Sequence, residues 1–259
     1  MEFDIYALLL VLGLLGGFIS GLLGIGGGII MVPLLLYTPQ LFGIPELAMR
    51  TVAGITTVQS FVGAVFGAYN HNKFKRIHLP LAYLMGIPMA IGSFTGSFFS
   101  EDVSNEFMLK AFGLMAMTAA ILLLIPKKKD DNLQDLEHVS FSKGLAVIIG
   151  GTIGVFAGII GQGGAFLFIP AMIYFLSIPT RVAIGTALII GIMSSSAVLV
   201  GRLGSAQIPW VWSLIIVVGV LIGAHFGSHL SQKIHVKILR YILAVIIIAT
   251  AVKIWIEVL

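Results

Sequence analysis

Eight apolar runs, each close to the length of a membrane-spanning helix, limit the fold of this chain more than any other feature. A helix needs about 20 mainly apolar residues to cross a bilayer. The runs lie at about 4–23, 47–70, 79–100, 107–125, 144–161, 181–201, 208–230 and 237–256. Only 10% of the 259 residues are charged, whereas soluble domains carry about 25%. The sequence therefore predicts an all-α polytopic membrane protein and excludes a soluble enzyme.

The two parts of the chain on either side of a polar stretch share a glycine pattern. The stretch 126–143 is a predicted linker between a first transmembrane repeat, 1–125, and a second, 144–259. Seven positions of the first repeat recur 137 residues later without a gap. They are Gly13, Gly17, Gly21, Gly24, Gly26, Gly27 and Pro33, which match Gly150, Gly154, Gly158, Gly161, Gly163, Gly164 and Pro170. Because the whole spacing is kept, we interpret the two parts as a duplication.

The positions of the basic loops predict that the repeats are inverted. In the first repeat the basic loop, 73–76, lies between the second and third long runs. In the second repeat it comes one loop later, at 233–240. The positive-inside rule places both loops and the linker 126–143 in the cytoplasm. Equivalent helices would then cross the membrane in opposite directions, and both termini are predicted outside.

Each glycine-rich segment is predicted to form a hairpin. The segment 144–177 has to cross an even number of times if 126–143 and 233–240 are both cytoplasmic. By symmetry, the segment 4–38 does the same from the other face. Each repeat would then hold a Gly-rich re-entrant or broken-helix hairpin and three long transmembrane helices. In the alternative topology each segment is one broken crossing, which gives eight spans in parallel repeats.

The hairpin tips are the first candidate binding site. A short apolar arm follows each glycine cluster, at about 28–38 and 164–177, so its helix N-terminus points toward the tip. Free N–H groups and the positive end of the helix dipole favour an anion there. The tip candidates are Gly24, Gly26, Gly27, Gly28, Gly161, Gln162, Gly163 and Gly164. Close packing is the alternative interpretation, and it is favoured for the GxxxG series of the long helices.

Polar side chains within the apolar runs supply further candidates. The second long helix of each repeat carries Thr57 and Gln59, or Thr186 and Ser195. Hydroxyl groups in helices often bond only the carbonyl one turn back, but an amide in a membrane must face protein or a cavity. Cationic candidates for meeting an anion are Arg50 and Arg202, which could instead extend to the membrane surface from the helix ends.

Acidic side chains are confined to loops and helix ends, so the apolar runs offer no carboxylate for proton coupling or cation binding. His225 and His229 lie one turn apart without a third ligand nearby in sequence, and there is no cysteine. No metal site, cofactor or enzymatic dyad is therefore expected. A neutral, hydroxyl-rich interior with a few cations suits an anion. An interior-negative potential drives anions outward by about 2.3 kcal/mol per charge per 100 mV.

The glycine motifs resemble a known family. A helix that runs into GLLGIGGGIIMVPLL, repeated later as GIIGQGGAFLFIPAM, is similar to the sulfite exporter TauE/SafE family of membrane proteins, and AIGTALIIGIMSSSA also fits. The resemblance covers about 8–256. It implies that the paired glycine motifs named above form the site. The two halves differ at Arg50, which corresponds to Gly185, and at Ile25, which corresponds to Gln162. We therefore expect an asymmetric site.

The resemblance implies a transporter that exports a small sulfur-containing anion, such as sulfite or sulfoacetate, across the bacterial cytoplasmic (inner) membrane. Alternating access with the anion between the tips is the expected mechanism. A passive anion channel and a non-transporting partner subunit are the alternatives. The expected partners are the anion and the lipid bilayer, with no nucleic acid. A homodimer through the glycine faces is left open.

Overall fold

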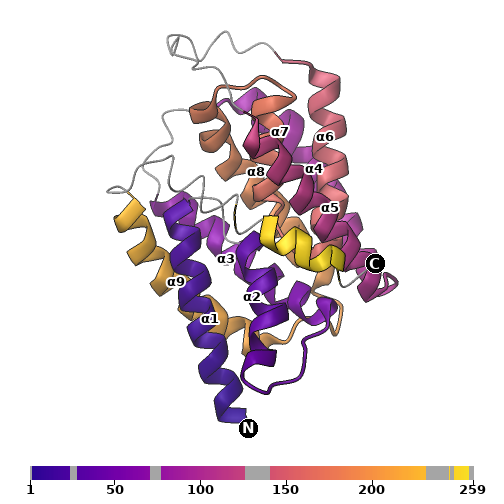
Figure 1. Cartoon of the computed structure of the whole chain (residues 1–259). Helices are drawn as coiled ribbons and strands as arrows, with labels where there is room; N and C mark the ends of the chain where they lie inside the picture. Colours follow the sequence, from indigo (N-terminus) through magenta and orange to yellow (C-terminus); the bar gives the residue numbers. More distant parts are fainter. Residues whose placement is uncertain are drawn as a thin grey trace.

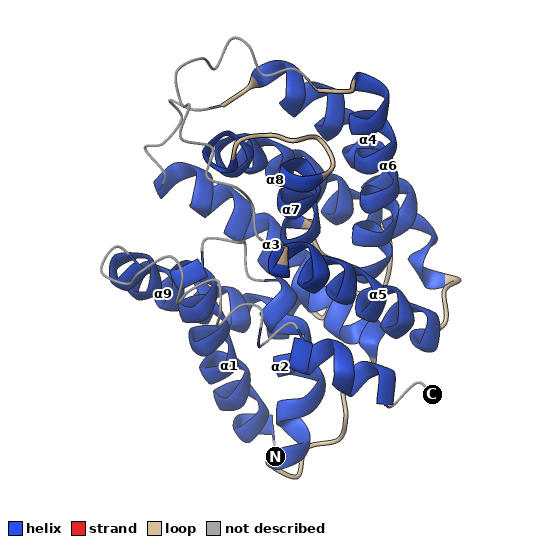
Figure 2. Cartoon of the chain, turned by 45° about the horizontal axis from the view of Figure 1, so that its top comes forward, coloured by secondary structure: helices blue, strands red, loops and turns tan. Residues whose placement is uncertain are grey.

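The structure is a computed structural model, and it describes residues 2–23, 28–70, 77–125, 141–231, 245 and 248–256. The regular elements of these residues are all helical, as Figure 2 shows. They are α1 (Glu2–Leu23), α2 (Gly28–Leu41), α3 (Met49–Asn70), α4 (Leu79–Phe98), the short 3₁₀ helix η2 (Phe99–Glu101), α5 (Asn105–Leu124), α6 (Lys143–Ile160), α7 (Ala165–Tyr174), α8 (Thr180–Arg202), α9 (Trp210–Ser231) and a last segment at 248–256. The all-α fold class is confirmed.

The helix boundaries agree with the predicted runs because polar residues cap the helix ends. The Ser104 hydroxyl accepts a hydrogen bond from the Phe107 backbone N–H at the start of α5. Ser142 caps α6 in the same way, as expected for N-cap serines. Six described helices, α1, α4, α5, α6, α8 and α9, are long and apolar enough to cross a membrane. Of the predicted run 237–256, only 245 and 248–256 are described.

The first glycine-rich segment is a hairpin, because α2 folds back along α1. A Cβ atom built on Gly16 of α1 would lie 2.7 Å from the Met31 Cε atom and 3.4 Å from a Leu34 methyl carbon of α2. In one continuous helix Gly16 and Met31 would be about 22 Å apart. The chain therefore reverses between α1 and α2, as the predicted hairpin requires, and does not continue as one straight helix.

The second glycine-rich segment folds back in the same way. A Cβ atom on Gly164, the N-cap of α7, would lie 3.3 Å from the Ile153 Cγ2 atom of α6. A continuous helix would separate these residues by about 16 Å. The turn itself is made at Gly161, which ends α6 with a φ of +79°. A left-handed conformation of this kind favours glycine.

The long helices pair through their glycine faces, and each pair joins the two halves of the chain. On α1, Gly13, Gly17 and Gly21 face Ile216, Val220 and Ala224 of α9 in the same order. On α6, Gly150, Gly154 and Gly158 face Met85, Met89 and Ser93 of α4. Figure 1 shows the first pair on one side of the molecule and the second on the other. The predicted packing role of these glycines is confirmed, and the contacts lie within one chain.

Helix directions divide the long helices into two sets. The residue order of the glycine contacts makes α1 parallel to α9 and α6 parallel to α4. In α4, Gly86 approaches Met193 and Ser97 approaches Gly201, so α8 is also parallel to α4. The chain therefore enters α6 and α8 in the same direction, which again requires the hairpin between them.

Of the two long helices that remain, α3 and α5, α3 belongs with α1 and α9. Gly54 of α3 approaches Gln207 just before α9, and Val58 lies in one apolar cluster with Val217 further along. The start of α3 also lies at the end of α4, because the Arg50 guanidinium donates to the Glu101 carbonyl. Consequently α1, α3 and α9 run one way, and α4, α6 and α8 run the opposite way.

The two short helices lie in the interior. Met31, Val32 and Leu35 of α2 and Phe168 and Met172 of α7 are fully buried. Non-helical backbone at membrane depth is tolerated only inside protein or beside a water-filled cavity, and the longer helices supply that cover. The described tip, 161–164, is thereby held within the bundle.

Candidate functional site

The described tip lies between the end of α6 and the start of α7. Gly161 and Gly164 both have positive φ values, +79° and +68°. A Cβ atom on Gly161 would collide with the Ala53 carbonyl of α3, so the turn packs directly against that helix. A Cβ atom on Gly163 would be 3.4 Å from the Ser195 Cβ atom of α8. The turn therefore needs glycine for both its shape and its close packing.

Gln162 connects the two glycine-rich segments. Its side chain is only 1% exposed, and its Nε2 atom donates a 2.9 Å hydrogen bond to the Gly28 carbonyl oxygen at the start of α2. A Cβ atom on Gly28 would lie 2.9 Å from the Gln162 Oε1 atom, which has no hydrogen-bond partner. The N-terminal ends of α2 and α7 thus meet through this amide. The other predicted tip residues, Gly24, Gly26 and Gly27, lie outside the described residues.

The structure places two of the predicted polar residues, Thr57 and Ser195, near this tip. A third, Gln59, is buried on α3 and has no described contact with the tip. The Thr57 hydroxyl donates to the carbonyl four residues earlier at 2.8 Å and lies 3.4 Å from the Gly161 carbonyl oxygen. Ser195 also donates to the carbonyl four residues earlier, at 2.6 Å. Gln59 is buried two residues beyond Thr57, and its Oε1 atom has no partner. Both hydroxyls are thus satisfied by their own helices, whereas the two amides keep an unpaired oxygen.

Thr186 is separate from this group. It precedes Ser195 by nine residues, which is about 13 Å along a helix. Its hydroxyl oxygen accepts a 3.1 Å hydrogen bond from the His78 backbone N–H. Thr186 therefore connects α8 to the residue that precedes α4, at a distance from the tip.

His78 is the N-cap of α4. Its Nδ1 atom accepts a hydrogen bond from the Leu81 backbone N–H at 3.1 Å, and its ring packs edge-on against Phe141. Burial lowers the pKa of His78 below its ordinary value of 6.5, and a backbone hydrogen bond partly opposes this. The neutral imidazole is the form that can accept the capping bond.

Arg202, at the end of α8, holds the turn from the other side. The residue is fully buried, and its guanidinium donates to the Ile159 and Gly158 carbonyls at 2.7 and 3.2 Å. A third bond, of 2.8 Å, reaches the Gln207 Oε1 atom. A cation at a helix C-terminus complements its unpaired carbonyls and its dipole. Arg202 does not extend to the surface; it caps α6 one turn before the tip.

Arg50 performs a similar task at the other predicted cationic position. Its Nη2 atom donates to the Glu101 and Val103 carbonyls, both at 2.9 Å. Its backbone N–H donates to the Asn105 side chain. The first turn of α3 is thereby tied to the segment between α4 and α5.

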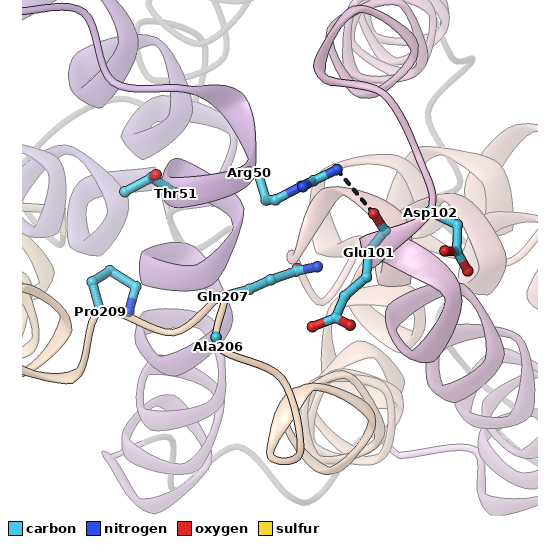
Figure 3. A pocket seen from close by; sticks show the side chains of 7 residues that line it. All are labelled: Arg50, Thr51, Glu101, Asp102, Ala206, Gln207 and Pro209. Carbon is cyan, nitrogen blue, oxygen red and sulfur yellow. Dashed lines mark hydrogen bonds between the residues drawn. The ribbon is translucent and has the colours of Figure 1, made fainter.

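An open pocket of about 600 Å³ lies beside these arginines (Figure 3). Its lining residues are Arg50, Thr51, Glu101, Asp102, Ala206, Gln207 and Pro209. Of the site residues predicted from the sequence, Arg50 alone lies in this lining. Gln207 precedes an apolar run in a loop, and no periodic pattern marks such a residue. Its one sequence signal is an amide next to a predicted span.

The described residues contain no group of three or more side chains able to hold a metal ion. His225 and His229 have ring centroids 5.0 Å apart, but no third ligand joins them in this part of the chain. What the tip offers chemically is two helix N-termini, the buried amide of Gln162 and the hydroxyls of Thr57 and Ser195. These groups can bind and orient a small polar solute; they include no nucleophile with a general base beside it.

Several known proteins are similar in sequence to this chain over most of its length. YunE of Bacillus subtilis (strain 168), a probable membrane transporter protein, is 23% identical over 260 residues, covering 94% of both chains. YjnA of the same organism is 25% identical over 95% of this chain and 98% of its own. A probable membrane transporter protein of Haemophilus influenzae is 27% identical over 80% of this chain and 78% of its own. No solved structure matches the chain.

The family comparison covers almost the whole molecule. The family model described as "Sulfite exporter TauE/SafE" matches residues 9–254, which include most of α1 and all the helices from α2 to α9. The six apolar helices agree with a multi-pass membrane protein. The chain therefore belongs to the sulfite exporter TauE/SafE family, and its relatives identify it as a membrane transporter.

Proposed function

We propose that this transporter exports a small sulfur-containing anion, sulfite or an organosulfonate such as sulfoacetate, by alternating access. The observation that carries the proposal is the contact between Gln162 and Gly28, which brings two short-helix N-termini together inside the bundle. Helix N-termini attract anions through their free N–H groups and dipoles. Secondary transporters commonly bind anionic groups at such broken-helix sites.

The proposal includes two inverted repeats in the bacterial inner membrane, with both termini outside. Helix direction supports it: α1 and α3 of the first half run opposite to their equivalents α6 and α8. Likewise, α4 runs opposite to α9. Exchange of the roles of two inverted halves is a general way to open one site alternately to either side.

The driving force in this proposal is the membrane potential. The described long helices carry acidic side chains only near their ends, at Glu2, Asp4 and Glu106. An anion moving outward gains about 2.3 kcal/mol per charge per 100 mV. No proton-carrying carboxylate is needed for such a cycle.

The test is flux in proteoliposomes of the purified full-length protein under an imposed potential, with sulfite, sulfoacetate, sulfate and chloride compared. We expect saturable efflux of sulfite or the organosulfonate that an opposing gradient of the same anion accelerates. Linear, non-saturating flux would support the channel, and absence of any anion flux would favour a partner subunit. Strict dependence on a pH gradient, with the potential clamped, would contradict the proposed driving force.

The site is tested by Gly163→Leu, because a Leu side chain would occupy the space between the tip and Ser195. We expect loss of transport in a protein that stays monodisperse. Gly144→Leu is the matched control, since nothing lies within 4 Å of a Cβ atom there. Full activity of Gly163→Leu would contradict a tip site.

A further inference from the structure

The open pocket lies where the two sets of helices meet. The start of α3, the end of the α4–η2 segment and the loop before α9 all line it. Figure 3 shows the Arg50 guanidinium and the Gln207 amide extending into the same space. Glu101 and Asp102 also line the pocket, and both are exposed.

Two positive charges beside this pocket have no carboxylate partner among the described residues. Arg202 is fully buried, and its hydrogen bonds go to backbone carbonyls and to the Gln207 amide oxygen. The Arg50 side chain likewise donates to two backbone carbonyls. A cation removed from water without an opposite charge is unfavourable. The Glu101 carboxylate offsets part of the Arg202 charge from a distance, and an anion in the pocket would add to that compensation.

Three nitrogen donors here lack a hydrogen-bond partner. Gln207 is only 9% exposed, and its Oε1 atom accepts from both Arg202 and Ser100, which fixes the orientation of the amide. The Gln207 Nε2 atom is then left unpaired, as are the Nε atoms of Arg50 and Arg202. Donors of this kind are satisfied only by an acceptor. All three atoms are shielded from solvent, so an acceptor oxygen in the pocket reaches the Arg50 and Gln207 nitrogens only after a small side-chain movement, and Arg202 lies behind them.

We propose that Arg50, Gln207 and the underlying Arg202 form a second anion site, a vestibule for a small oxyanion distinct from the hairpin-tip site. Arg202 lies between the two, because its guanidinium also holds the carbonyls of Gly158 and Ile159 behind the tip. The carboxylates of Glu101 and Asp102 repel an anion, so the vestibule binds weakly and releases readily. The proposal extends the transport proposal and concerns binding alone.

The experiment is isothermal titration of sulfite, and separately of sulfate, into the purified full-length protein. Arg50→Gln is expected to weaken binding about tenfold, because one charge and its donors are lost. Gln207→Leu, which removes the unpaired amide, is expected to weaken it as well. Glu101→Gln is expected to tighten binding about threefold, since it removes a repelling charge of the rim.

Lys110→Gln is the control, because it makes the same charge change as Arg50→Gln at a surface pair with Glu106. We expect its affinity to match the unaltered protein. Glu101→Gln guards against misfolding as an explanation, because disruption of the fold would not produce tighter binding. Unchanged affinity in Arg50→Gln, or weaker binding in Glu101→Gln, would overturn the vestibule.

Gly163→Leu separates this proposal from the tip site. If both proposals hold, this variant loses transport and keeps the vestibule affinity. If binding disappears in Gly163→Leu and persists in Arg50→Gln, the tip is the anion site and the vestibule is wrong. If Gly163→Leu transports normally while Arg50→Gln loses binding, the result supports the vestibule and contradicts the tip site.

Discussion

At the scale of single residues, the fully buried arginine at the end of α8 stabilises the tip. Arg202 donates to the Ile159 carbonyl at the end of α6, and to the Gly158 carbonyl, which also accepts from the Gly161 backbone N–H where the chain turns. The planar guanidinium serves these carbonyls and the Gln207 amide together. A lysine ammonium is a compact point charge that cannot reproduce this geometry.

Arg202→Lys should therefore destabilise the protein, by about 2 kcal/mol for the lost charge-assisted hydrogen bonds. Thermal unfolding of the purified protein, followed by intrinsic fluorescence, measures the effect. The reverse exchange at an exposed position, Lys143→Arg, is the control and should leave the midpoint unchanged. Equal midpoints for Arg202→Lys and the unaltered protein would mean that these bonds contribute nothing.

The buried amide of Gln162 allows a test of the sign of the substrate charge. Gln162→Glu changes one atom group and adds a negative charge beside the start of α2. For an anion, transport should fall about a hundredfold or more, because an unscreened like charge disfavours binding. Gln40→Glu, at an exposed end of α2, is the control. Flux in proteoliposomes decides, and retained anion flux in Gln162→Glu would exclude the tip as the anion site.

At the scale of elements, the N-cap of α4 should respond to pH. The neutral form of His78 is favoured in the folded protein, so its pKa is lowered. Below 6.5 the unfolded chain binds more protons at this residue than the folded one, and stability is lost as pH falls. His78→Asn keeps a capping side chain without a titrating ring.

We expect a smaller drop in the unfolding midpoint for His78→Asn than for the unaltered protein between about pH 8 and about pH 5. Thermal unfolding at both pH values measures it. Identical drops in the two proteins would show that His78 contributes no pH dependence.

The glycine faces make a second prediction for elements. A Cβ atom on Gly13 would lie 2.6 Å from the Ile216 carbonyl oxygen, and backbone cannot move aside without separating α1 from α9. Gly13→Ala should thus destabilise by about 2 kcal/mol. Gly63→Ala, where the space is open, should stabilise by about 0.5–1 kcal/mol through helix propensity. The order of the two unfolding midpoints is the readout, and a stabilised Gly13→Ala would contradict the packing.

The elements were largely predictable from sequence, whereas the partners of each helix were not. The lengths of the apolar runs predicted the helices. The hairpins were predicted because two basic loops on the same side of the membrane must be separated by an even number of crossings. The GxxxG spacing around Gly17 predicted a close helix contact. No local pattern indicates that its partner is Val220, which lies far along the chain. The vestibule was missed for a related reason: Gln207 gains its partners Ser100 and Arg202 only through tertiary packing.

At the scale of the whole molecule, the two halves are interlocked. The first helix of each half lies along the fourth helix of the other, as α1 on α9 and α6 on α4. Movement of one entire half against the other would break both glycine interfaces. A movement of the set α1, α3 and α9 against the set α4, α6 and α8 would keep them, and we propose these sets as the moving units.

Separating the chain within 126–143 tests the interlocking. Either fragment expressed alone would expose glycine faces that have no partner, so we expect aggregation or degradation of each. Co-expression should restore a monodisperse pair that co-purifies through a tag on one fragment. A single fragment that is monodisperse and thermally stable would show that the α1–α9 and α6–α4 pairs are not needed for folding.

Because α1 packs against α9 of the other half, its partner helix is synthesised much later than α1 itself. The last residue of α1 precedes the first residue of α9 by 187 positions, Leu23 to Trp210. At 5–20 residues per second, the ribosome needs about 10–40 s to supply the partner. During that interval the glycine face of α1 lacks its partner helix and contacts lipid or the insertion machinery. We therefore expect newly made molecules of this protein to be most vulnerable to quality-control proteases before their second half emerges.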